Sequence, residues 1–137
     1  MNKEIGNSKL NNGYAHVLLV DDEDYLVKLW KRVIESRGYK VTSYTSGLEA
    51  LEDFRDRPGD FDIVITDQSM PEITGFELAK EILKIRSDVK FILCSGYLGD
   101  IDLNNEINQR IDVILQKPFD SNALIEAIES VLNNIYK

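Results

Sequence analysis

The sequence has few of the residues that cross-link a chain or anchor it in a membrane. Cys94 is its single cysteine, so no internal disulfide can form, and its place in the apolar run Phe91–Cys94 predicts a buried structural thiol. The apolar runs are only a few residues long, far short of the roughly 20 residues that a membrane-spanning helix needs. No basic segment followed by an apolar run opens the chain, so we expect no signal peptide. A reducing, cytoplasmic location fits these absences.

Positive charge is also scarce. Lysine and arginine total 16 against 24 aspartates and glutamates, which gives a net charge of −8 and a pI near 4.6. Without a basic stripe, direct binding to nucleic acid is not expected, and neither is docking on an anionic membrane. The chain has neither G-x-G-x-x-G nor a P-loop, which excludes the usual dinucleotide and nucleotide sites. The lone histidine, His16, opens an apolar run and is interpreted as structural or exposed, not as a phosphodonor.

Five short apolar runs predict five strands, at residues 16–20, 41–45, 63–66, 90–94 and 112–116. The first and third runs lack polar alternation, which is typical of strands buried on both faces of a parallel sheet. Between the runs lie segments with apolar residues at helical spacing. Leu29 in the first of these segments and Leu48 in the second are expected to pack against the sheet.

The remaining segments complete an alternation of strands and helices. Two S/T-x-x-E patterns, at 46–49 and 74–77, predict capping boxes. The polar segment 99–110 is interpreted as a short helix, and the apolar face of the last helix extends to Ile135. We therefore predict an α/β protein, a single doubly wound (βα)5 flavodoxin-like domain with a parallel five-stranded sheet of order 2-1-3-4-5. Residues 1–13 are expected to form a flexible N-terminal tail, and 14–137 the domain.

Polar side chains come directly after the predicted strands. Asp21 and Asp22 follow the first strand, Asp67 the third, Ser95 the fourth and Lys117 the fifth. In an open parallel sheet the carboxyl ends of the strands are where ligands bind. Three acids this close repel one another unless a cation lies between them, and Mg²⁺ prefers such oxygen ligands. A cation, a lysine and a hydroxyl together suit phosphoryl transfer, and attack by a carboxylate would give an aspartyl phosphate.

Each of these residues also has a purely structural explanation. Asp21 and Asp22 could cap the first helix, Asp67 could form an Asx-turn, Ser95 could be a turn serine and Lys117 a solvated lysine. These explanations do not account for the fact that all of them fall at the same end of their strands. We therefore favour the functional interpretation.

The chain resembles the receiver (response regulator) domains of two-component signalling over residues 16–135. Four short motifs carry the resemblance: Leu19–Asp22, Asp67 with Met70–Pro71 and Gly75, Ser95–Gly96, and Lys117–Phe119. Each motif is weak alone, but their order and spacing are specific. The resemblance implies that Asp67 is phosphorylated by a histidine kinase or a histidine phosphotransfer protein. It also implies a switch in protein–protein interactions, with a downstream protein effector and homodimerisation on phosphorylation left open.

The resemblance further implies a metal site. Asp22 and Asp67 would bind Mg²⁺ directly, together with the backbone carbonyl of Ser69. Asp21 would act mostly through water. Whether the chain is a stand-alone regulator or the receiver portion of a hybrid histidine kinase stays open at this point.

The resemblance implies roles for two further residues, and the chain differs from the family at one position. Lys117 would contact the phosphoryl oxygens, and Ser95 would move to bond the phosphorylated aspartate. The Lys117–Pro118 peptide is expected to be cis. Three residues before the lysine, where such domains often carry Tyr or Phe, this chain has Ile114. The usual aromatic readout of phosphorylation is therefore in question, although the phosphorylation chemistry is not.

Two other functions would use parts of the same pattern. A phosphatase of the haloacid dehalogenase type would use Asp22 of the Asp22–Asp24 D-x-D pattern, but Tyr25 follows where Thr or Val is usual, and Asp67 is left without a role. A non-phosphorylated binding module would not need five polar residues to be kept together. We therefore expect a phosphoacceptor domain and not an enzyme.

Overall fold

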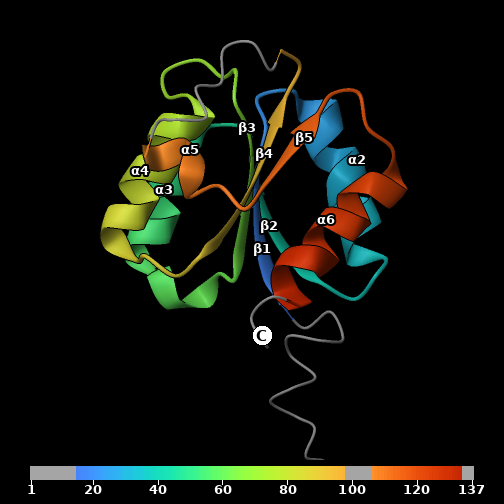
Figure 1. The fold of residues 1–137 in the computed structure, drawn as a ribbon, viewed down its shortest axis with the longest axis horizontal. Coiled ribbons are helices and arrows are strands. Elements are labelled where there is room, and N and C mark those ends of the chain that lie inside the picture. The colour runs from blue at the N-terminus through green and yellow to red at the C-terminus, as the bar shows by residue number, and fades with distance from the viewer. Residues whose placement is uncertain (1–14, 98–105, 134–137) are drawn as a thin grey trace, which may run out of the picture.

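The computed structural model describes residues 15–97 and 106–133, and its centre is a five-stranded parallel sheet (Figure 1). The strands are β1 (His16–Val20), β2 (Lys40–Tyr44), β3 (Ile63–Asp67), β4 (Lys90–Ser95) and β5 (Val113–Gln116). Their order is β2-β1-β3-β4-β5, as predicted. All neighbouring pairs are parallel, so the carboxyl ends of β1, β3, β4 and β5 meet at one edge of the sheet.

Helices cover both faces of the sheet, which confirms the doubly wound α/β class. On one face lie α2 (Asp24–Glu35) and α6 (Ser121–Asn133); on the other lie α3 (Gly47–Asp56), α4 (Gly75–Ile85) and α5 (Glu106–Gln109) (Figure 1). A short 3-10 turn, η1 (Pro58–Asp60), precedes β3. The predicted tail 1–13, most of the predicted helix 99–110 and Ile135 lie outside the described residues. Within the described ranges, no helix is long and apolar enough to cross a membrane.

The core has two halves, one on each face of the sheet. Every residue of β1 and β3 is buried because helices cover both faces, which is why these strands show no polar alternation. Successive side chains of a strand point to opposite faces. Val17 and Leu19 therefore pack with α2 and α6, whereas Leu18 and Val20 pack with α3 and α4.

Two predicted core positions were wrong. Leu29 and Leu48 are both 47% exposed. In α2 the buried side is set by Val27 and Ile34, and Leu29 lies two residues, or about 200°, around the helix from Val27. Leu48 likewise points away from the buried side of α3, which contains Ala50. In both helices the apolar pattern is wider than the face that reaches the sheet.

The helix starts agree with the predicted caps in part. Thr74 and Glu77 form the full reciprocal capping box of α4. At α3, the Ser46 side chain accepts a hydrogen bond from the Glu49 backbone N–H, which is half of the predicted box.

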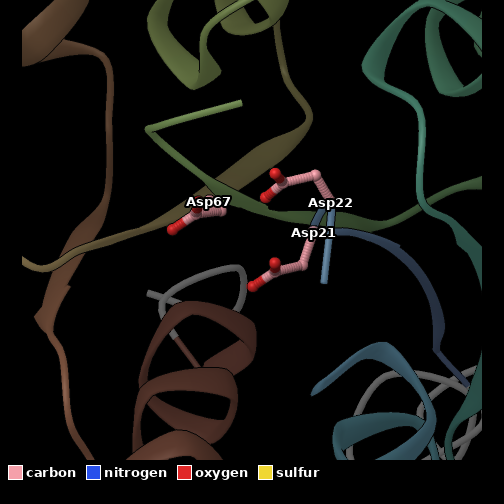
Figure 2. A group of neighbouring side chains, drawn as sticks. All are labelled: Asp21, Asp22 and Asp67. Atoms are coloured by element: carbon pink, nitrogen blue, oxygen red, sulfur yellow. The ribbon is translucent and has the colours of Figure 1, made fainter. Parts of the chain in front are cut away.

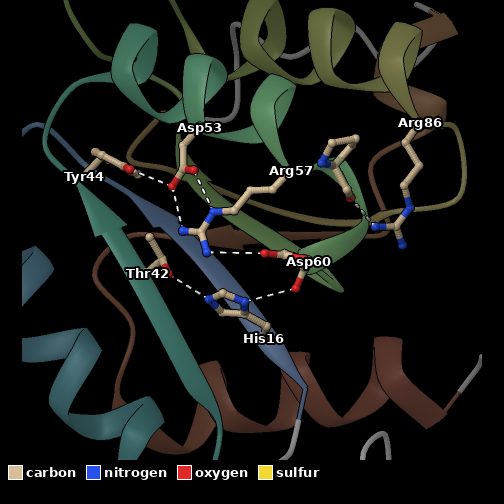
Figure 3. Close-up of polar contacts among 8 residues, drawn as sticks. His16, Thr42, Tyr44, Asp53, Arg57, Asp60 and Arg86 are labelled. Atoms are coloured by element: carbon tan, nitrogen blue, oxygen red, sulfur yellow. Dashed lines mark hydrogen bonds and ion pairs between the residues drawn. The ribbon is translucent and has the colours of Figure 1, made fainter.

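His16 is structural, as one of its two interpretations predicted. Figure 3 shows its ring between β2 and η1, where Nε2 lies 2.7 Å from Thr42 Oγ1 and Nδ1 lies 3.0 Å from the Asp60 carbonyl oxygen. His16 is 4% exposed, and its ring packs against that of Phe61. Burial lowers the pKa of His16, so the neutral ring is favoured in the folded protein.

Candidate functional site

Three carboxylates converge at the carboxyl edge of the sheet (Figure 2). Asp21 and Asp22 follow β1, and Asp67 is the last residue of β3. One oxygen from each of the three lies within 4.8 Å of the others. Asp21 and Asp67 are buried and Asp22 is exposed. Three oxygen donors at this spacing could hold a divalent cation, and they fit the preference of Mg²⁺ for hard oxygen ligands with water in its remaining positions.

Lys117 joins two of these carboxylates. Its Nζ lies 3.1 Å from Asp21 Oδ2 and 2.9 Å from Asp67 Oδ1. The lysine follows β5, so residues 96 positions apart in sequence become direct partners only because β1, β3, β4 and β5 are neighbours. The ammonium group neutralises part of the charge that burial of two acids would otherwise leave uncompensated.

Burial and ion pairing act against each other in this cluster. Burial raises the pKa of Asp67, and the hydrogen bond from Lys117 opposes that rise without cancelling it. Burial acts to lower the pKa of Lys117, but its bonds to Asp67 and Asp21 outweigh this effect and the pKa is raised. Lys117 therefore stays charged and favours the ionised, nucleophilic form of Asp67.

Asp21 also has a local structural role. Its Oδ1 accepts a hydrogen bond of 2.9 Å from the Glu23 backbone N–H, just before α2 begins. The helix-start explanation of this acid is thus correct for one of its oxygens, while the other oxygen bonds Lys117. Asp22 has its carboxylate exposed beside them.

The start of α4 packs against the end of β3. A Cβ added to Gly75 would lie 2.6 Å from the Asp67 carbonyl oxygen and 2.7 Å from Leu93 Cδ1. Only glycine allows this approach, because any side chain would push the helix away from the strand. Gly75 therefore brings the first turn of α4 next to the residue that ends β3.

Ser95 ends β4 and is buried, but its hydroxyl is bonded locally. Its Oγ donates to the Tyr97 carbonyl oxygen at 3.1 Å and accepts from the Tyr97 N–H at 3.3 Å. Ser69 is exposed in the loop after β3. The Lys117–Pro118 peptide is cis, as predicted. Ile114 is half-buried on the α3 and α4 side of the sheet.

Sequence reasoning missed two aromatic neighbours of the site. Trp30 of α2 and Phe119 stack with ring centroids 5.0 Å apart. Both line a small cavity that also touches Asp21, Asp67 and Lys117. The spacing of Trp30 in the sequence is that of an ordinary apolar position of a helix, and no signal in the sequence indicates that it lies beside the carboxylates.

The chain is similar in sequence to known proteins. The model of the response regulator receiver domain matches residues 17–129. The sensor kinase CckA of Brucella abortus (strain 2308) is 40% identical over 121 residues, which are 88% of this chain and 13% of that protein. The response regulator SaeR of Staphylococcus aureus (strain USA300) is 33% identical over 123 residues, 90% of this chain and 53% of that protein. The chain thus spans about half of one relative and a small part of the other.

A solved structure has the same fold. The response regulator protein TrrA from Thermotoga maritima, crystallised in complex with Mg(2+)-BeF, has a TM-score of 0.76 and 32% sequence identity to this chain. The alignment covers 85% of this chain and 98% of that one.

Proposed function

The chain belongs to the response regulator receiver domain family, and on that premise we propose that Asp67 is its phosphoacceptor residue. The family is one of phosphoacceptor domains, not of catalytic enzymes. The observation that carries the assignment is the placement of Asp67, buried at the end of the central strand and bonded to Lys117 at 2.9 Å. Asp21 and Asp22 flank it within the same cluster of oxygens.

The proposed reaction is a transfer between side chains. A carboxylate oxygen of Asp67 attacks the phosphorus of a phosphohistidine, an O–P bond forms, and the N–P bond breaks so that the electron pair returns to the imidazole. Lys117 offers its ammonium group to the phosphoryl oxygens, where negative charge must be stabilised. Because Lys117 contacts Asp67 already, it needs little rearrangement to do so.

We propose Mg²⁺ as the cofactor, bound by Asp22, Asp67 and the backbone carbonyl of Ser69, with Asp21 acting through water. Bound magnesium would neutralise negative charge on the phosphoryl oxygens. Its donors fit, because three carboxylate oxygens lie within 4.8 Å of one another. The complex of TrrA with Mg(2+)-BeF supports the choice of metal.

The partners and the response follow from the same proposal. The phosphodonor is a histidine kinase or a histidine phosphotransfer protein, met in the cytoplasm. Ser95 is proposed to leave its bonds to Tyr97 and bond the phosphorylated Asp67, which changes the surface near β4 and β5. With Ile114 on β5, the change is read without an aromatic ring at that position. We also propose that residues 14–137 form the receiver domain.

Mass spectrometry after incubation with Mg²⁺ and a small acyl phosphate tests the assignment. The wild-type protein should gain one phosphoryl group on Asp67, and Asp67→Asn should gain none while keeping its fold by circular dichroism. Label on Asp22 would contradict the proposal and favour a phosphatase that uses the first strand.

The metal assignment has its own test. Asp22→Ala should weaken Mg²⁺ binding more than Asp21→Ala, because a direct ligand contributes more than one acting through water. Equal losses of affinity would contradict the assigned ligand set.

A further inference from the structure

We propose that Gln68 is a positioning residue, which holds the loop 68–74 and thereby the Ser69 carbonyl in register with Asp67. This inference rests on the proposed function, because it concerns how the metal site is held. Gln68 is absent from the family motifs discussed above, and nothing in the sequence pattern singled it out.

Gln68 makes three hydrogen bonds, one to β4 and two to the first turn of α4. Its backbone N–H donates to the Cys94 carbonyl oxygen of β4 at 2.9 Å. Its backbone carbonyl accepts from the Gly75 N–H at 3.0 Å, and its side-chain Oε1 accepts from the Phe76 N–H at 2.9 Å. One residue therefore links β3, β4 and α4.

These bonds complete the start of α4. The first N–H groups of a helix have no partner within the helix and must find one elsewhere. In α4 the Glu77 N–H is taken by the Thr74 side chain, while those of Gly75 and Phe76 are taken by Gln68. The two ends of the loop, Gln68 and Thr74, thus bind the same helix turn and close the loop.

The closed loop holds a strained residue. Glu72 has a φ of 71°, in the left-handed region that costs a non-glycine residue about 1 kcal/mol or more. Such a conformation persists only where the surrounding structure determines it. Here the bonds from Gln68 fix both ends of the segment that contains Glu72, together with the close approach of Gly75 to the Asp67 carbonyl oxygen.

The position of Ser69 depends on this arrangement. Ser69 directly follows Gln68, and its side chain is exposed, so the side chain does not anchor the residue in the site. The direction of its carbonyl depends on the backbone that Gln68 ties to β4 and α4. A backbone ligand displaced by about 1 Å is a poor ligand, so losing the side-chain bond should weaken metal binding.

The test compares Gln68→Met, which keeps the side-chain length but removes the acceptor, with Gln68→Glu, which keeps an acceptor oxygen. Gln109→Met is the matched control, because Gln109 is exposed on α5. Trp30, the single tryptophan, lines the cavity beside Asp21 and Asp67, so its fluorescence can follow titration with Mg²⁺ alone. Hydrogen exchange at the Phe76 amide reports the bond itself.

We expect Gln68→Met to raise the Kd for Mg²⁺ by roughly fivefold to tenfold and to speed exchange at Phe76. Gln68→Glu should keep Phe76 protected and bind Mg²⁺ no more weakly than the wild type, and Gln109→Met should match the wild type in both. A Gln68→Met protein that exchanges faster at Phe76 but binds Mg²⁺ with unchanged affinity would overturn the proposal, because the bond would then serve only the helix. Should Gln68→Met fail to fold, Gln68→Asn, one methylene shorter, is judged by the same two measurements.

These outcomes separate this inference from the proposed function. If the wild-type protein takes no phosphoryl group, the proposed function fails, while the Mg²⁺ titration still judges Gln68. If the wild type is phosphorylated and Gln68→Met binds Mg²⁺ and accepts the phosphoryl group as the wild type does, the function stands and the role of Gln68 is refuted.

Discussion

Replacing Lys117 with methionine should destabilise the magnesium-free protein by about 3 kcal/mol at pH 7. Removing one partner from a buried ion pair costs about 3–5 kcal/mol, since it leaves charge without compensation. Lys117 keeps 23% of its side chain exposed, against 7% for Asp21 and 8% for Asp67, which places the cost at the lower end. Two carboxylate oxygens within 4.8 Å repel each other by about 3.5 kcal/mol at an effective dielectric of 20, a similar magnitude.

The loss should depend on pH and on magnesium in defined directions. Burial already raises the pKa of Asp67, and without Lys117 it rises further, so the folded variant binds a proton more readily than the unfolded chain. Its deficit against the wild type therefore shrinks as the pH falls from 7 towards 5. Mg²⁺ should bind the variant more tightly, because the competing ammonium is gone. At 100 times its Kd, Mg²⁺ adds about 2.7 kcal/mol of stability.

Urea unfolding with and without Mg²⁺ measures these effects. Lys84→Met is the control, because Lys84 pairs with Glu81 at the surface and should contribute less than about 1 kcal/mol. The double variant Lys117→Met with Asp67→Asn should regain most of the lost stability, since it removes the repulsion. Equal free energies of unfolding for Lys117→Met and the wild type in magnesium-free buffer would refute the reasoning.

Three further predictions concern the lifetime of the phosphoryl group, His16 and Cys94. The resemblance to receiver domains implies that Ser69 and Tyr97 border the approach of the water that hydrolyses an aspartyl phosphate. Ser69 is too short to orient that water and Tyr97 is bulky enough to exclude it, so self-hydrolysis should be slow. The double change Ser69→Asn with Tyr97→Glu should speed it about tenfold, or 1.4 kcal/mol of barrier. Unchanged decay by mass spectrometry after donor removal would contradict this. Burial lowers the pKa of His16 in the folded protein. Below about pH 6.5 the unfolded chain therefore binds a proton more readily than the folded protein does. The free energy of unfolding should fall as the pH is lowered from 7 to 5. Urea titrations should show a smaller fall for His16→Gln. Burial raises the pKa of the Cys94 thiol to about 12, so a thiol reagent at pH 8 should react slowly with the native protein and fully in urea; fast native labelling would show that the thiol is accessible.

The sequence predicted the strand order, and it predicted which polar side chains lie at the carboxyl ends of the strands, because apolar runs and the residues that follow them are visible in the sequence. Parallel strands such as β1 and β3 must be apolar throughout, and this pattern is visible in the sequence. Asp67 and Lys117 were predicted to lie at the carboxyl ends of their strands because each directly follows a predicted strand, and the structure places both there. Leu29 and Leu48 were misplaced because helical spacing defines an apolar side, while the width of the side that is buried depends on the neighbouring elements.

The bonds within the site needed the tertiary structure. Asp21, Asp67 and Lys117 are far apart in the chain, and only the packing of their strands decides that Lys117 bonds both acids while the Ser95 hydroxyl bonds Tyr97. Gln68 illustrates the same limit, since a glutamine after an aspartate carries no signal until its side chain is seen on the Phe76 N–H. Residue type and spacing determined which groups reach the edge of the sheet, because strand direction follows from sequence pattern. The partner of each group was decided only in three dimensions, because hydrogen bonds form over about 3 Å and depend on how separate elements pack.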